Sequence, residues 1–163
     1  MDPLAIGKSS PQSRVWRYAP LILWMALIFF ASTDAFSAGN TTGLIRSILT
    51  WLFPQISEGR IEVLHLLIRK LAHFSTYAIL ALLAVRAFAG SSHRVLREHW
   101  VVTSALLVIG YSFLDEFHQS FVPSRSASIF DSLIDIAGGL FVLICLVVFK
   151  RPRRQLDSKG QTI

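Results

Sequence analysis

The chain has 163 residues, of which 53% are hydrophobic and 16% are charged, and its formal net charge is +6. Average soluble domains carry about 25% charged residues, and the apolar residues here form long blocks. This pattern indicates that the bilayer is the solvent and argues against a water-soluble domain. The basic residues lie in short tracts beside apolar segments, which fits anionic lipid, so no nucleic-acid partner is expected. The single cysteine, Cys145, excludes an internal disulfide and a cysteine-based metal cluster.

Four apolar segments are long enough to cross the hydrocarbon core as helices, which takes about 20 residues each. They lie at residues 15–33, 70–89, 99–117 and 128–149. The sequence therefore predicts an all-α integral membrane protein, with one four-helix membrane domain over residues 15–149. A disordered tail is expected before it, at residues 1–14, and a basic tail after it, at residues 150–163.

The connection between the first two spans contains a further apolar stretch at residues 43–53. It is too short to span, but Leu44, Ile48, Trp51 and Leu52 share one helical face. We therefore predict a short helix that lies in the membrane interface or re-enters the membrane. Helix is expected again from Ile61, running into the second span.

The distribution of basic residues orients the chain. Most of the 16 Lys and Arg residues lie in the two tails and in the connection between the second and third spans. Four spans place these three segments on the same side, which the positive-inside rule makes cytoplasmic. We therefore expect both termini in the cytoplasm, a location in the cell (inner) membrane, and the other ends of the spans facing outside or the periplasm.

Polar side chains gather at the outer ends of the last three spans. On the second span, the spacing of Lys70, His73 and Tyr77 places all three on one helical face. The third span ends with Asp115, Glu116, His118 and Gln119, and the fourth follows Arg125 and carries Ser128, Asp131 and Asp135. Ionisable groups at membrane depth are costly and normally pair inside the protein. We therefore expect Lys70 or Arg125 to pair with one of the four acids, and Arg69 to reach lipid headgroups.

Two sequence blocks carry a family resemblance. KLAHFSTYAILALL (residues 70–83) and DEFHQSFVPSRSASIFDSLIDIAGG (residues 115–139) resemble the VanZ-like family, named for a protein associated with resistance to the glycopeptide teicoplanin. The chain departs from the family pattern at Ser124, where glycine is common, and at Asp135, where asparagine is often found. The resemblance implies no particular biochemical activity. Its characteristic positions are Lys70, His73, Tyr77, Asp115, Glu116, Gln119, Arg125, Asp131 and Asp135.

Three functions fit the polar layer. The first is a site for an anionic lipid or a lipid-linked cell-wall precursor, held by Arg and Lys groups and affecting teicoplanin susceptibility. Its ligand-binding residues would be Lys70, Tyr77, His118, Gln119, Arg125, Ser128 and Asp135. A partner other than such a lipid is not identified by the sequence.

The second function is a membrane-embedded hydrolase or transferase that acts on a lipid phosphate or headgroup. Its catalytic residues would be His73, Asp115, Glu116 and Asp131. No known catalytic motif is present, no cofactor or metal-ligand set is defined, and the carboxylates could bind a divalent cation.

The third function is structural, with ion pairs that only lock the bundle. A ligand site predicts a cavity between the outer ends of the second, third and fourth spans, whereas the structural function predicts complete pairing without a cavity.

Overall fold

The computed structural model describes residues 11–33, 38–123 and 128–149. These residues form helices and no strand, in the order α1 (Pro11–Ala31), α2 (Ala38–Leu52), α3 (Glu58–Ala89), α4 (Arg94–Glu98), α5 (Trp100–Gln119) and α6 (Ile129–Phe149). Four of them, α1, α3, α5 and α6, are long and apolar enough to cross a membrane. The prediction of an all-helical chain with four membrane-spanning helices is therefore confirmed.

Two predicted segments differ in extent from the observed helices. The short apolar helix is present as α2, which begins at Ala38 rather than near Gly43. Its depth in the membrane stays a prediction. Helix α1 begins at Pro11, within the segment expected to be disordered, and proline is favoured in the first helical turn. The rest of that tail and the predicted basic tail at residues 150–163 lie outside the described residues.

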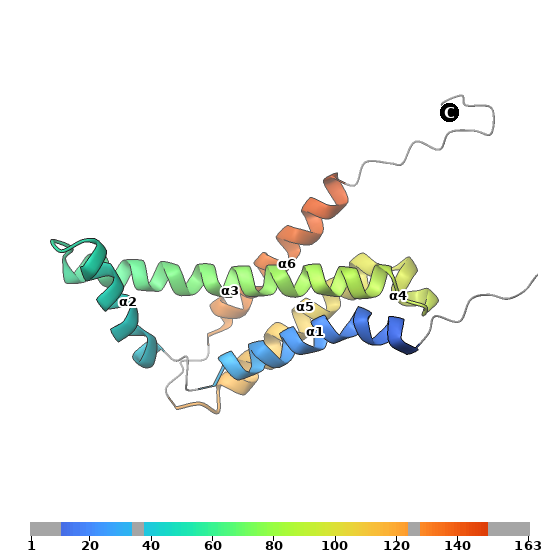
Figure 1. The fold of residues 1–163 in the computed structure, drawn as a ribbon, viewed down its shortest axis with the longest axis horizontal. Helices are drawn as coiled ribbons and strands as arrows, with labels where there is room; N and C mark the ends of the chain where they lie inside the picture. The colour runs from blue at the N-terminus through green and yellow to red at the C-terminus, as the bar shows by residue number, and fades with distance from the viewer. Residues whose placement is uncertain (1–10, 34–37, 124–127, 150–163) are drawn as a thin grey trace, which may run out of the picture.

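Helix α3 is the central element of the fold (Figure 1). It runs without a break from Glu58 to Ala89, as expected for a helix that continues into the second span. Its 32 residues correspond to about 48 Å of helix, which exceeds the hydrocarbon thickness of about 30 Å. Three alanines in its C-terminal part, Ala81, Ala84 and Ala87, are fully buried. Helix α3 therefore both crosses the bundle and extends past the other spans.

Helix α6 crosses α3 at an angle (Figure 1) and packs closely against both α3 and α5. Two glycines permit this contact. A Cβ added at Gly138 would lie 2.2 Å from the carbonyl oxygen of Phe74, and one at Gly139 would lie 2.5 Å from Cγ1 of Val108. Small residues commonly allow such close approach between membrane helices. The two glycines are therefore packing residues.

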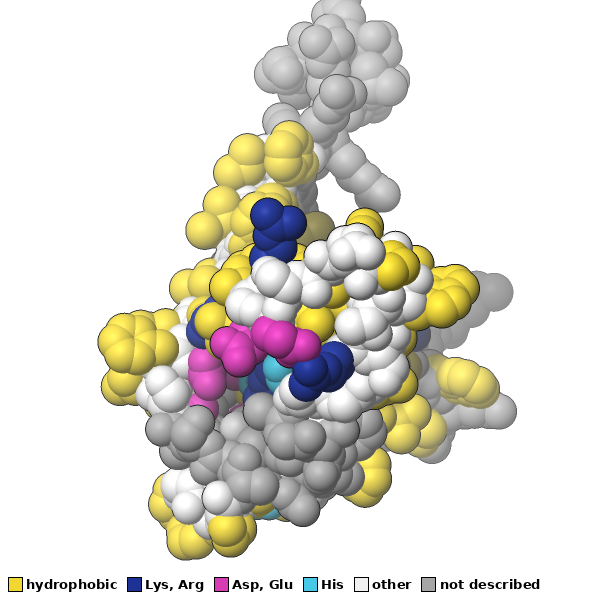
Figure 2. Space-filling view, turned by 90° about the vertical axis from the view of Figure 1, so that its left-hand side faces the viewer, with side chains coloured by type: hydrophobic (Ala, Val, Ile, Leu, Met, Phe, Trp, Pro, Cys, Tyr) yellow, Lys and Arg dark blue, Asp and Glu magenta, His cyan; other side chains and the backbone are white. Residues whose placement is uncertain are grey.

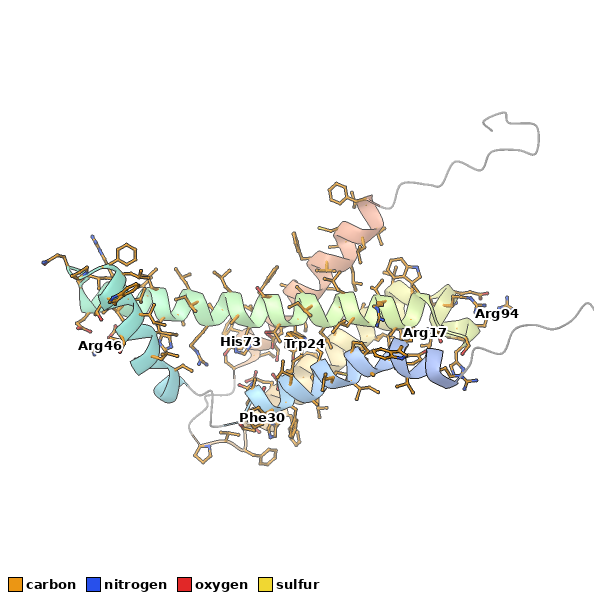
Figure 3. The ribbon with its side chains drawn as sticks, viewed as in Figure 1. Arg17, Trp24, Phe30, Arg46, His73 and Arg94 are labelled. Carbon is orange, nitrogen blue, oxygen red and sulfur yellow. The ribbon has the colours of Figure 1, made fainter. Side chains whose placement is uncertain are left out.

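The opposite end of the bundle from α2 collects basic residues. Arg86 of α3 donates hydrogen bonds to the backbone carbonyls of Trp16 and Arg17 at the start of α1. The hydroxyl of Tyr18 donates to Ser91 at 2.7 Å. Figure 3 shows Arg17 and Arg94 together at this end and Arg46 at the other. The basic residues of α1 and of the α3–α4 region thus lie at this end, whereas those of α2 and of the first half of α3 lie toward the other. That the first of these ends is cytoplasmic stays a prediction.

Candidate functional site

Two pairs join α3 to α6 at the start of α6. Nδ1 of His73 lies 3.1 Å from Oδ1 of Asp135, whose side chain is 3% exposed. One turn away, Nζ of Lys70 lies 3.5 Å from Oδ1 of Asp131. Lys70 and His73 share one face of α3, and Asp131 and Asp135 share one face of α6. The two contacts therefore lie one above the other along the α3–α6 interface, about one helical turn apart. The expected pairing of Lys70 with an acid is confirmed, and Asp135 is satisfied by a histidine.

Asp115 of α5 is paired in a different direction. One carboxylate oxygen accepts a hydrogen bond from the hydroxyl of Ser32, and the other accepts one from Nε2 of Gln119 at 3.0 Å. Asp115 is buried, with 4% of its surface exposed. Its face of α5 is turned toward the end of α1, whereas Lys70 faces α6. The two therefore form no ion pair, and neutral hydrogen-bond donors satisfy the carboxylate.

Several predicted site residues have structural partners. Glu116 accepts a hydrogen bond from the backbone N–H of Ser128. The hydroxyl of Ser128 accepts one from the N–H of Phe130 at 3.3 Å, as expected for a residue that caps the start of a helix. The ring of His118 stacks on Phe29, with centroids 4.1 Å apart. These three residues therefore shape the start of α6 and the α1–α5 contact. The predicted binding residue Arg125 lies outside the described residues.

A cavity of about 270 Å³ lies beside this polar network, and it is partly open to the surface. The end of α1, the inner face of α2, the middle of α3 and the end of α5 enclose it. Its apolar walls come from Ile28, Ala31, Ile45, Ile68 and Ala72. Its polar lining consists of Ser32, Thr41, Arg69, His73, Thr76, Tyr77 and Asp115.

The cavity is not where the sequence placed it. We expected it between the second, third and fourth spans, but no residue of α6 lines it. The close crossing at Gly138 leaves no space between α3 and α6. The space lies instead on the other side of α3, under α2. Of the predicted site residues that are described, only His73, Tyr77 and Asp115 line the cavity.

Arg69 is one of the Arg and Lys groups that could hold a phosphate, although it is not among the predicted ligand-binding residues. It was expected to reach lipid headgroups, but its side chain lines the cavity and forms no hydrogen bond or ion pair with any described residue. A usable signal was present, because Arg69, His73 and Thr76 follow the helical spacing i, i+4 and i+7 and so share a face of α3. The cavity-lining hydroxyl groups of Ser32, Thr41 and Thr76 were also missed.

The two charged side chains that line the cavity, Arg69 and Asp115, differ in their hydrogen-bond partners. Asp115 accepts two hydrogen bonds, whereas Arg69 has no partner among the described residues. On the end of the molecule that carries α2, basic and acidic side chains gather around a histidine (Figure 2). Within the described residues, no three His, Cys, Asp or Glu side chains are grouped to hold a metal ion. The Arg69 guanidinium beside apolar side chains is a group that can bind an anion with an apolar neighbour.

A protein-family model described as VanZ/LLP1 matches residues 18–150, which cover most of the chain. The chain belongs to the VanZ/LLP1 family. All candidate residues from Lys70 to Asp135 lie within the matched segment, so the resemblance that the two sequence blocks indicated is confirmed. No curated protein and no solved structure was found to match the chain. The chain is thus a multi-pass membrane protein of the VanZ/LLP1 family.

Proposed function

We propose that this VanZ/LLP1 protein binds an anionic lipid, or a lipid-linked cell-wall precursor, by its phosphate group in the cavity between α1, α2 and α3. The observation that carries the proposal is Arg69, which lines a cavity with apolar walls and has no hydrogen-bond or ion-pair partner among the described residues. A guanidinium group attracts a counter-charge, and its planar donors match the oxygens of a phosphate. The residues that bind would be Arg69 and His73, helped by the hydroxyl of Thr76, because the Ser32 hydroxyl already donates to Asp115.

The size of the cavity supports a lipid headgroup rather than a whole lipid. A volume of about 270 Å³ is at the lower limit of small-molecule pockets, which start at about 300 Å³. A phosphate group fits such a space, and the attached chain must leave through the open side into the surrounding bilayer. The isoleucines at positions 28, 45 and 68 provide an apolar wall for the first carbons of that chain.

The cavity also argues against a purely structural function. Such a function requires that the polar groups satisfy one another, as Lys70 and Asp131 do. Arg69 does not meet this requirement within the described part of the chain. With the basic end in the cytoplasm, the cavity would face outside or the periplasm. A protein that holds an envelope lipid there would alter the surroundings in which a lipid-bearing glycopeptide such as teicoplanin acts.

The proposal is tested by binding of farnesyl monophosphate, with farnesol as the uncharged comparator, to the protein purified in detergent. Ligand that binds the folded state raises the thermal unfolding midpoint, so a titration yields an affinity. We expect stabilisation by the monophosphate only. Arg69→Gln should weaken its binding by about tenfold or more, because a hydrogen bond to a charged group contributes about 1.5–3 kcal/mol.

Arg60→Gln is the matched control, since Arg60 is an exposed arginine on the same helix. It should bind as the unchanged protein does. Equal stabilisation by farnesol, or equal loss in both arginine variants, would contradict the proposal.

A further inference from the structure

His73 belongs to both the α3–α6 network and the cavity. Its Nδ1 faces Asp135 of α6 at 3.1 Å, and its ring lines the cavity on the other side of α3. No described residue hydrogen-bonds to the other ring nitrogen, Nε2. Because no residue of α6 lines the cavity, Nε2 is the nitrogen that is available to a molecule bound there.

A buried carboxylate at Nδ1 has a chemical consequence for Nε2. The carboxylate of Asp135 accepts the Nδ1 proton, which fixes the neutral tautomer with an unprotonated Nε2 and holds the ring in place. It also stabilises the imidazolium that forms when Nε2 takes a proton. A histidine oriented in this way is equipped to act as a general base. Asp135 touches only His73 in this scheme, so it is a positioning residue.

The described lining of the cavity offers a base but no matching acid. Both oxygens of Asp115 accept hydrogen bonds, so this carboxylate has no proton to give in the observed arrangement. The hydroxyl of Tyr77 is directed to the backbone carbonyl of Tyr111, at 3.5 Å. The cavity therefore provides no proton donor for a reaction whose leaving group must be protonated, such as cleavage of an alkyl phosphate monoester. A reaction whose leaving group departs as a stable anion does not need such a donor.

We propose that the cavity hydrolyses a lipid diphosphate to the lipid monophosphate, with His73 as the general base and Arg69 holding the terminal phosphate. This inference rests on the proposed function, because it requires the phosphate group to occupy the same cavity. The leaving group of a phosphoanhydride is itself a phosphate, which needs no proton to depart. The substrate class is thus set by the groups that line the cavity.

The reaction balances with water as the only co-reactant. The oxygen of a water molecule forms a bond to the terminal phosphorus while Nε2 of His73 takes one of its protons. The bond between that phosphorus and the bridging oxygen breaks, and its electron pair stays on the bridging oxygen. The products are inorganic phosphate and the lipid monophosphate, and His73 returns the proton to solvent. Arg69 offsets the charge on the terminal oxygens throughout.

The test is release of inorganic phosphate by the purified full-length chain in detergent, with magnesium present as the counter-ion of the diphosphate. Three probes are compared, namely farnesyl diphosphate, farnesyl monophosphate and inorganic diphosphate. We expect phosphate release from farnesyl diphosphate alone. His73→Gln should reduce kcat by about 100-fold or more, the usual range for a general base, while farnesyl monophosphate still binds through Arg69 with weaker affinity. His93→Gln, an exposed histidine at the other end of the bundle, should leave kcat unchanged.

A second pair of variants separates positioning from binding. Asp135→Asn should lower kcat with little change in KM, whereas Arg69→Gln should mainly raise KM. A merely structural Asp135 would instead lower the amount of folded protein without changing kcat per folded molecule, and that result would overturn its positioning role.

The remaining outcomes each decide a separate point. Binding of farnesyl diphosphate without phosphate release would overturn the hydrolysis and leave the proposed binding function intact. Equal turnover of the monophosphate would overturn the assigned substrate class, and equal turnover of inorganic diphosphate would overturn the assignment to a lipid. Absence of binding by all probes would overturn the proposed binding function as well.

Discussion

The two sides of α3 are built in opposite ways. On the side that faces α6, glycine brings two helix backbones into contact, and the ionisable groups of both helices pair with each other. On the side that faces α2, the same helix leaves a cavity of about 270 Å³ and an arginine without a described partner. His73 contributes to both sides, with one ring nitrogen paired to α6 and its ring at the cavity wall.

The difference separates residues that hold the bundle from residues that are available to a ligand. Polar pairs and close helix contact on the α6 side fix the direction of the α3 side chains. On the α2 side, that fixed face presents Arg69, His73 and Thr76 to a space that the described residues do not fill. A small membrane protein can therefore use one helix as both scaffold and binding surface. The following predictions test that division, beginning with the variant expected to have the largest effect.

Gly138→Val should disrupt the packing of α6 against α3. The added Cβ would lie 2.2 Å from a backbone oxygen of Phe74, which cannot move without displacing α3. Overpacking of this kind costs about 3 kcal/mol, and we expect a matching loss in the free energy of unfolding measured in detergent. Gly110→Val is the control, because nothing lies within 4 Å of a Cβ at Gly110. An equal loss in both variants would show that α6 is not closely packed against α3.

Asp115→Ala should have the next largest effect on stability. The substitution leaves the buried Ser32 hydroxyl and Gln119 amide without their acceptor. A buried polar group left unsatisfied costs about 1–3 kcal/mol, so we expect a loss of about 2 kcal/mol in the free energy of unfolding. Glu98→Ala serves as the comparison, since Glu98 forms only an exposed pair with Arg94. A smaller loss for Asp115→Ala than for Glu98→Ala would contradict the pairing described.

Much of the fold could be predicted from the sequence because the signals are local. Twenty or so consecutive apolar residues determine a spanning helix almost without reference to its neighbours. The pairing of Lys70 with an acid was also predictable, since a charge in the membrane requires a partner.

The cavity could not be predicted because it depends on how the helices cross. Helical spacing places Arg69 and His73 on related faces, but it does not say which neighbouring helix covers each face. The sequence predicts a cavity beside α6, because Asp131 and Asp135 lie on that helix. The close crossing at Gly138 leaves no space between α3 and α6, and the short helix α2 encloses the cavity on the opposite side of α3. Ser32 and Thr41 lacked any sequence signal, because hydroxyl residues near helix ends are common.

Ala72→Phe tests whether the ligand binds in the cavity on the α2 side of α3. Ala72 lines the cavity, so a larger side chain can occupy existing space without displacing backbone. We expect the free energy of unfolding to change by no more than about 0.5 kcal/mol. The affinity for farnesyl monophosphate should fall about tenfold, or about 1.4 kcal/mol, as measured by thermal-shift titration. Ala19→Phe, at an exposed position of α1, should change neither quantity, and unaltered affinity in Ala72→Phe would place the ligand elsewhere.

The pair of Lys70 and Asp131 should contribute least. Their charged groups lie 3.5 Å apart, but the two side chains are 39% and 36% exposed, and ion pairs of that kind contribute about 0–1 kcal/mol. A double-mutant cycle with Lys70→Met and Asp131→Asn should yield a coupling energy of about 0.5 kcal/mol. Because Lys70 does not line the cavity, Lys70→Met should also leave the affinity for farnesyl monophosphate unchanged. If it weakened binding as much as Arg69→Gln does, the anion would lie on the α6 side of α3, and the division between the two sides would be wrong.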